Sequence, residues 1–326
     1  MSTTTLDRTT TEHETTYAPY HVYHAEAHVL SGKLDRPIQQ NIERQIPVHL
    51  EDRRGGHLTR ITEDFSLEGF ISFQRGETRV SGSAGVKKPG WVTLSTSILE
   101  GLNVFDVITA DRVVSQVSTR HAQVNGHVPD VTFLGTQFKN LALNGLTITP
   151  KFDLGVCGAR PSGDEPDLPY VTSEPLLTAA KKQVERVLRC KTLPDNVREE
   201  YDRRLVTLQI LSSKGRVGKS CHEATHITCS LIQDIEIEGL EHTKIPGVEI
   251  LGNVIVIQDF GAVALAEVEV GLEFSKEHHR PANGSIAAKP RLSNYFQTTM
   301  LQMHLGCIGH GTVSAGTTKS NGNTAP

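Results

Sequence analysis

The stretch GNVIVIQDFGAVALAEVEVG, residues 252–271, decides the expected fold. It links two runs, 248–257 and 260–270, in which valine, isoleucine and alanine dominate, as they do in buried β-strands. Apolar and acidic side chains alternate along the second run, at Val263, Leu265, Glu267, Val268 and Glu269. The pattern predicts two successive β-strands.

Most of the remaining chain has the same apolar-rich composition, interrupted by glycines such as Gly55, Gly56 and Gly76. Further strands are expected at 19–30, 43–50, 57–61, 65–73, 91–98, 104–119, 131–134, 138–149, 205–212, 225–238 and 295–305. Many short strands between glycine turns favour an antiparallel sandwich over a parallel sheet. The expected fold class is therefore mainly β, an antiparallel β-sandwich or jelly-roll-like arrangement.

One region breaks the β pattern and predicts a helical insertion around 173–204. Apolar residues recur on one helical face at Leu176, Leu177, Ala180, Val184, Val187 and Leu188. Ser173 is a plausible N-cap, Pro175 suits the first helical turn, and Pro194 ends the amphipathic segment. A second, short polar helix is expected after Pro194.

The composition divides the chain into five parts. Threonine-rich ends without periodicity predict disordered tails, because such segments cannot form a packed core. The expected organisation is a tail at 1–17, an N-terminal β unit at 18–159, a linker and helical insertion at 160–204, a C-terminal β unit at 205–315 and a tail at 316–326.

Composition also excludes several classes of function. The chain has 326 residues, a formal net charge of −4 and 5% aromatic residues, so neither nucleic-acid binding nor an attraction to acidic membranes is expected. No apolar run reaches the roughly 18 residues of a transmembrane helix, and no secretory signal is recognised. Five cysteines without a C-x-x-C pair predict reduced thiols in a cytoplasmic protein, with non-classical export left open.

The segment KGRVGKS, residues 214–220, resembles the deviant phosphate-binding loop of the ParA/MinD ATPases. In that loop, backbone N–H groups and a lysine bind phosphate and a hydroxyl binds Mg²⁺. The resemblance implies Gly218, Lys219 and Ser220 as nucleotide-binding residues. Arg216 departs from the glycine of the motif, and a strand-like sequence follows. A basic hairpin turn is the preferred interpretation, and an ATPase is kept as an alternative.

The next residues, HEATH at 222–226, match the H-E-x-x-H pattern of zinc hydrolases. On a helix, His222 and His226 could bind Zn²⁺ while Glu223 activates water, with Glu241 as a further candidate ligand. The local composition favours a strand, on which residues four apart lie about 13 Å from each other. An exposed strand start is therefore preferred, and the zinc hydrolase is the first alternative, ahead of the ATPase.

Two further groups of histidines have spacings that suggest metal binding. His21, His24 and His28 lie on an expected strand, where only His24 and His28 share a face. His304, Cys307 and His310 follow one another at intervals of three residues near a glycine-rich turn. Ordinary surface or half-buried histidines are the preferred interpretation of both groups.

The C-terminal region resembles a group of uncharacterised bacterial β-rich proteins with a G-x-V-I…F-G-x-V-x-L-A-E strand pair followed by T-M-L…L-G-C. The matching residues are Gly252, Val254, Ile255, Phe260, Gly261, Val263, Leu265, Ala266 and Glu267, then Thr299, Met300, Leu301, Leu305, Gly306, Cys307 and Gly311. The segment around 108–149 is more loosely similar to the choice-of-anchor P proteins, which are typically exported. Both resemblances imply β architecture and bring no catalytic residues.

These observations favour a non-catalytic structural or binding protein that acts through protein partners or self-association. No cofactor is expected, and Zn²⁺ belongs only to the hydrolase alternative. Threonine-rich strand faces and open strand edges are the features on which the self-association hypothesis depends.

Overall fold

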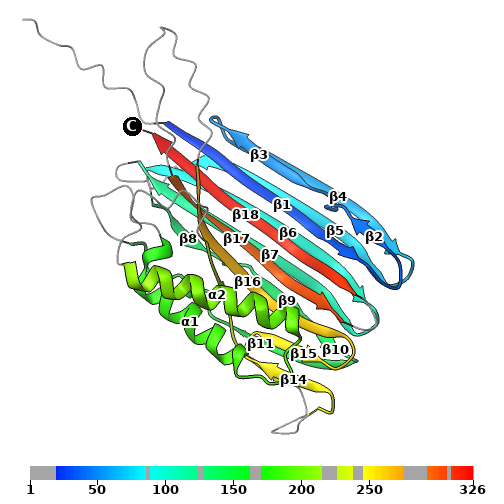
Figure 1. The fold of residues 1–326 in the computed structure, drawn as a ribbon. Helices are drawn as coiled ribbons and strands as arrows, with labels where there is room; N and C mark the ends of the chain where they lie inside the picture. Colours follow the sequence, from blue (N-terminus) through cyan, green and yellow to red (C-terminus); the bar gives the residue numbers. More distant parts are fainter. Residues whose placement is uncertain are drawn as a thin grey trace, which may run out of the picture.

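The computed structural model describes residues 20–85, 89–123, 128–161, 170–214, 226–237, 245–274, 292–306 and 310–325. The tail expected at 1–17 lies outside these residues. Two antiparallel sheets pack face to face, and two helices lie beside them (Figure 1). The expected mainly β sandwich with a helical insertion is confirmed.

The first sheet, sheet A, has the spatial order β14-β15-β16-β17-β18-β1-β2, with β12 beside β16 and β3 beside β1. Its strands are β1 (Tyr20–Leu34), β2 (Gln40–Ile42), β3 (Val48–Asp52), β12 (His226–Ser230), β14 (Val248–Leu251), β15 (Val254–Ile257), β16 (Gly261–Phe274), β17 (Leu292–Leu305) and β18 (Gly311–Ala325).

The second sheet, sheet B, has the order β13-β11-β10-β7-β6-β5-β4, with β8 and β9 beside β7. Its strands are β4 (Gly56–Leu67), β5 (Ile71–Ala84), β6 (Gly90–Val104), β7 (Ile108–Ala122), β8 (Asp130–Thr132), β9 (Gln137–Lys139), β10 (Ala142–Leu143), β11 (Leu146–Phe152) and β13 (Ile232–Ile237).

The space between the sheets changes character along the strands. One half holds a large apolar cluster built from side chains such as Leu99 and Phe133. The other half holds a smaller apolar cluster around Tyr23 and small hydroxyl side chains that bond across the gap, for example Ser115 to Thr318 at 2.7 Å and Thr119 to Ser320 at 2.8 Å. Part of the chain's serine and threonine is therefore buried inside the sandwich.

Part-way along β1, the set of side chains that faces the interior changes from odd-numbered to even-numbered residues. In β1 the fully buried side chains sit at odd positions up to Val29 and at even positions from Leu30. The change coincides with Gly316 of the paired strand β18, whose φ of 66° lies in the left-handed region that glycine adopts freely. Before this point, even-numbered residues of β1 face outward.

The helices α1 (Glu174–Leu188) and α2 (Asp195–Lys214) pack against each other beside β12. The amphipathic face predicted for 173–188 is buried, as Leu176, Ala180 and Val184 show. The strand expected at 205–212 is wrong, because these residues form the last turns of α2. Leu208 and Leu211 are buried on a helical stripe, while the apolar neighbours Val206 and Ile210 face solvent.

The disordered tail expected at 316–326 is also wrong. Residues up to Ala325 belong to β18, which lies between β17 and β1 in the middle of sheet A. In Figure 1 the end of β18 lies beside the start of β1, and their pairing extends from Tyr20↔Ala325 to Leu34↔Gly311. The N-terminal strands β1 to β3 therefore share a sheet with the C-terminal strands.

Three described cysteines, Cys157, Cys190 and Cys229, are free and buried. None of the described helices is both long and apolar enough to cross a membrane.

Candidate functional site

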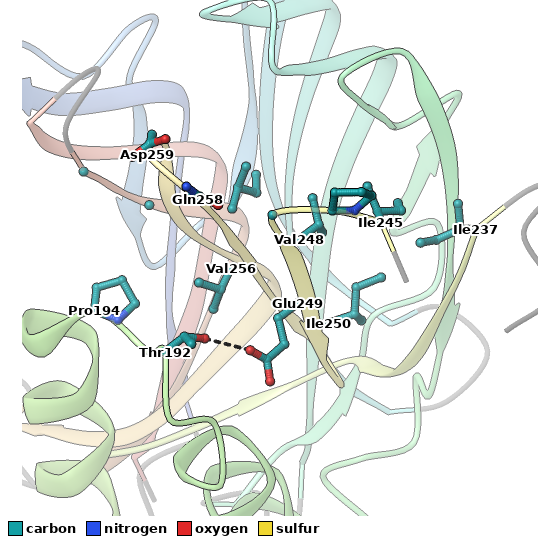
Figure 2. A pocket seen from close by; sticks show the side chains of 15 residues that line it. Thr192, Pro194, Ile237, Ile245, Val248, Glu249, Ile250, Val256, Gln258 and Asp259 are labelled. Carbon is teal, nitrogen blue, oxygen red and sulfur yellow. Dashed lines mark hydrogen bonds between the residues drawn. The ribbon is translucent and has the colours of Figure 1, made fainter. Parts of the chain in front are cut away.

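A hollow of about 1020 Å³ surrounds the β14–β15 hairpin, and we call it the hairpin cavity (Figure 2). It extends from the end of β13 to the loop between α1 and α2. The lining residues are Thr192, Pro194, Ile237, Ile245, Pro246, Gly247, Val248, Glu249, Ile250, Val256, Ile257, Gln258, Asp259, Gly261 and Gly306.

The hairpin itself follows from the local sequence. Its turn is at Gly252 and Asn253, and Gly252 has a φ of 72°, which suits a two-residue hairpin turn. The register places Glu249 opposite Val256, and residues directly opposite share a face of the ribbon. One face therefore presents Glu249 and Val256, and the other presents branched aliphatic side chains.

The cavity wall is mainly aliphatic and only partly covered. Ile237, Ile245, Val248 and Ile250 are all half-buried in the structure, and Figure 2 shows them grouped on one side of the hairpin. Removing such apolar surface from water is favourable by about 25 cal/mol per Å². A ligand that covers these four side chains gains binding energy without any specific polar contact.

Few polar groups reach the cavity. Glu249 accepts hydrogen bonds from Thr192 Oγ1 at 2.7 Å and from Cys190 Sγ at 3.2 Å, so its carboxylate is tied to the loop between the helices. Gln258 and Asp259 are exposed at the rim. This arrangement, an apolar hollow with a few polar side chains, is typical of small-molecule sites.

A smaller polar hollow of about 440 Å³ lies between α2 and the outer face of sheet A. Its base is a buried ion pair in which Arg204 Nη1 donates to Glu267 Oε1 at 2.5 Å and Nη2 donates to Oε2 at 3.2 Å. Tyr201 also donates to Glu267, at 3.3 Å.

The charges of this pair support each other. Burial alone would raise the pKa of Glu267, but the guanidinium of Arg204 outweighs it and holds that pKa below its ordinary value. Burial opposes the charge of Arg204 as well, and Glu267 raises the pKa of that guanidinium well above its ordinary range. Both groups are thus charged and fully engaged, which suits a structural anchor for α2 better than acid–base catalysis.

The buried thiols are poor candidates for nucleophiles. Burial raises the pKa of Cys157 to about 12, so its thiol remains protonated at neutral pH. Burial likewise raises the pKa of Cys229 well above its ordinary value.

Most residues singled out from the motifs lie outside the described residues. These are Gly218, Lys219, Ser220, His222, Glu223, Glu241 and Cys307. His226 is described as the exposed first residue of β12, at the edge of the polar hollow.

The two histidine groups are dispersed. His304 lies 3.3 Å from Glu200 of α2, while His310 lies 3.0 Å from Asp35. On β1, His21 faces the interior, where burial and the nearby His121 lower its pKa to about 2. His24 and His28 face outward, as the strand prediction required.

The hairpin cavity was missed by sequence reasoning. Its lining comes from three segments that are distant in sequence. In addition, an aliphatic strand has the same sequence pattern whether its side chains face the core or a cavity. The unusually continuous apolar run at 254–257 was a signal for strands, not for a ligand.

Comparison with known proteins gives one match. The model of a family described as "Domain of unknown function (DUF8256)" matches residues 21–271, well over half of the chain. No curated protein and no solved structure matches the chain.

Proposed function

We propose that this chain, which belongs to the DUF8256 family, is a non-catalytic β-sandwich protein that binds a small apolar molecule in the hairpin cavity. The cavity is the observation that carries the proposal. Its volume of about 1020 Å³ is at the upper end of the range for small-molecule sites, about 300–1,000 Å³.

The lining sets the chemistry of the ligand. Partly exposed aliphatic side chains favour a molecule with an aliphatic or aromatic body. The carboxylate of Asp259 at the rim disfavours an anionic group at that end and favours a hydrogen-bond donor.

Binding of a neutral fluorescent probe, N-phenyl-1-naphthylamine, tests the proposal. A neutral probe is chosen because carboxylates line the cavity. The wild-type chain should raise the probe's fluorescence in a saturable way with one probe per chain. Val248→Trp should weaken this binding markedly, because the indole occupies part of the cavity and covers the aliphatic wall beside the half-buried Val248.

Val206→Trp is the matched control. Val206 is 53% exposed on α2 and does not line the cavity, so the same substitution there should leave probe binding unchanged. Absence of saturable binding by the wild type, or equal binding by both variants, would refute the proposal.

A second role, association with another copy of this chain, is favoured by the edge strand β4. Among the described strands, β4 pairs only with β5 and lies at the end of sheet B, where its outer edge can accept another strand. It carries two exposed apolar side chains, Leu58 at 45% and Ile61 at 52%.

The charges of β4 indicate which partner fits. The first half carries His57 and Arg60, and the second half carries Glu63 and Asp64. In an antiparallel pair of two β4 strands with the two-fold axis at Thr62, Arg60 of one copy lies opposite Asp64 of the other, and Ile61 is next to the axis. We propose this pairing as the mode of self-association.

Sedimentation over a range of concentrations tests the pairing. The wild type should form dimers as concentration rises, Ile61→Lys should remain monomeric, and the surface control Val206→Lys should dimerise like the wild type. A wild type that is monomeric throughout, or an Ile61→Lys variant that dimerises normally, contradicts the pairing.

A further inference from the structure

Two copies of the tripeptide pattern H-x-E meet on the outer face of sheet A. They are His24-Ala25-Glu26 in β1 and His49-Leu50-Glu51 in β3. The antiparallel register pairs His24 with Glu51 and Glu26 with His49. All four side chains therefore lie on one face, with each histidine opposite a carboxylate.

One carboxylate oxygen joins the two imidazoles. Oε1 of Glu26 lies 3.0 Å from Nε2 of His24 and 3.6 Å from Nδ1 of His49. The candidate ligand atoms of the three residues lie within 4.8 Å of one another. Donors around a tetrahedral Zn²⁺ are roughly 3.3 Å apart, since metal–ligand distances are about 2.0–2.2 Å. The distances from Oε1 of Glu26 to the two imidazole nitrogens, 3.0 and 3.6 Å, are thus already close to that spacing.

The fourth residue, Glu51, orients His49. Oε2 of Glu51 lies 3.3 Å from Nε2 of His49. In the neutral imidazole, Nε2 carries the proton and donates a hydrogen bond to this carboxylate. The lone pair of His49 is then on Nδ1, the nitrogen that faces Glu26. A carboxylate that holds the outer nitrogen of a ligating histidine is a recurrent feature of zinc sites.

The second oxygen of Glu26 has a different neighbour. Oε2 lies 3.7 Å from Nη1 of Arg44, so a guanidinium is the neighbour of this oxygen. Oε1 is left as the oxygen shared by His24 and His49. His24 and Glu26 are half-buried and His49 is exposed, so the site is accessible to an ion from solvent.

We propose that His24, Glu26 and His49 form a zinc site, with water as the fourth ligand and Glu51 as the carboxylate that positions His49. The site uses none of the residues of the HEATH motif, and it lies outside the hairpin cavity. Three protein ligands leave the fourth position to an exchangeable water. The ion would also tie the short strand β3 to β1.

Zinc titration of the chelator-treated full chain, without a polyhistidine tag, tests the site against a competing chromophoric indicator. The wild type should bind one Zn²⁺ per chain, and Glu26→Gln should lose this binding. Glu51→Gln should retain the site with an affinity about 10–100-fold weaker, the usual effect of losing a carboxylate that orients a ligand. Co²⁺ should give the visible absorption of a tetrahedral N/O site in the wild type and not in Glu26→Gln.

His57→Asn is the control for unspecific binding by surface histidines. His57 is exposed on β4 and contacts Thr59, so its loss should not change the stoichiometry. Thermal unfolding in the presence of chelator should be the same for all variants, which separates loss of the site from loss of the fold. Substoichiometric zinc in the wild type, or equal zinc binding by Glu26→Gln, overturns the proposal.

Discussion

Replacing Arg204 by methionine should destabilise the protein more than any comparable change on the surface of α2. The side chains of Arg204 and Glu267 are 16% and 7% exposed and share two hydrogen bonds. Removing one member of a buried ion pair leaves the other charge uncompensated, at a cost of about 3–5 kcal/mol. Because Tyr201 still donates to Glu267, we expect the lower end, about 3 kcal/mol.

The double variant Arg204→Met with Glu267→Gln identifies the cause. Glutamine removes the stranded charge and keeps an acceptor for Tyr201, so it should recover about 2 kcal/mol of the loss. Arg203→Met is the matched control, because Arg203 is exposed on the same helix and its replacement should change stability by less than about 0.5 kcal/mol.

Urea unfolding followed by circular dichroism measures these free energies, and pH gives a second signature. The folded-state pKa of Glu267 is lowered, so its contribution is complete above the unfolded-state pKa and is lost as the pH falls through the folded-state value. The wild type should therefore lose stability below about pH 4.5, and the variants that carry Glu267→Gln should lose less. A loss below about 1 kcal/mol for Arg204→Met, or no recovery in the double variant, would refute the reasoning.

Three further predictions concern the sandwich. Gly82→Ala should cost about 1–3 kcal/mol in a urea melt, because the new methyl lies 2.5 Å from Cγ of Tyr23; a neutral effect would contradict the close approach. Thr318→Val should cost about 1–3 kcal/mol by stranding the hydroxyl of Ser115, and adding Ser115→Ala should restore most of it; equal losses would argue against the bond. Deletion of residues 317–326 should prevent folding, measured by circular dichroism and proteolysis, since it removes most of β18; a protease-resistant truncated chain would show that β18 is dispensable.

The incorrect prediction of a strand at 205–212 has a physical cause that can be recognised in the sequence of α2. Val197, Tyr201, Leu208 and Leu211 are buried at spacings that follow one helical stripe, with Arg204 between them. The prediction considered 205–212 alone, where exposed Val206 and Ile210 add apolar residues to the solvent face and hide the period. The neighbouring segment 173–188 was predicted correctly because its apolar residues are confined to one face.

The error in β18 has a different origin. Its inward side chains include Thr318, Ser320 and Thr324, so no apolar alternation is present to read. These hydroxyls are buried because they bond to Ser115 and Thr119 of β7 and to His21 of β1. Sequence patterns assume that the core is apolar, and they fail where a core is satisfied by hydrogen bonds instead.

The two H-x-E tripeptides show which part of the proposed zinc site can be predicted from the sequence. The first tripeptide lies within the strand expected at 19–30, and the second begins inside the strand expected at 43–50. Alternation alone places each histidine beside its glutamate on one face. What the sequence does not contain is the register between β1 and β3, which brings Glu26 opposite His49. A shift of one residue would turn His49 to the other face and remove the three-ligand geometry.

The two candidate binding sites lie near opposite edges of sheet A, and this separation decides how their tests combine. The hairpin cavity is built on β14 and β15, and β1 lies four strands away from β15 in the sheet order. At the usual strand spacing this is roughly 19 Å, beyond the range over which independent sites influence each other strongly. Zinc binding should therefore be unaffected by Val248→Trp, and probe binding should be unaffected by Glu26→Gln. If either variant lost both zinc binding and probe binding, the cause would be a disturbed sheet A. That variant would then give no information about either site.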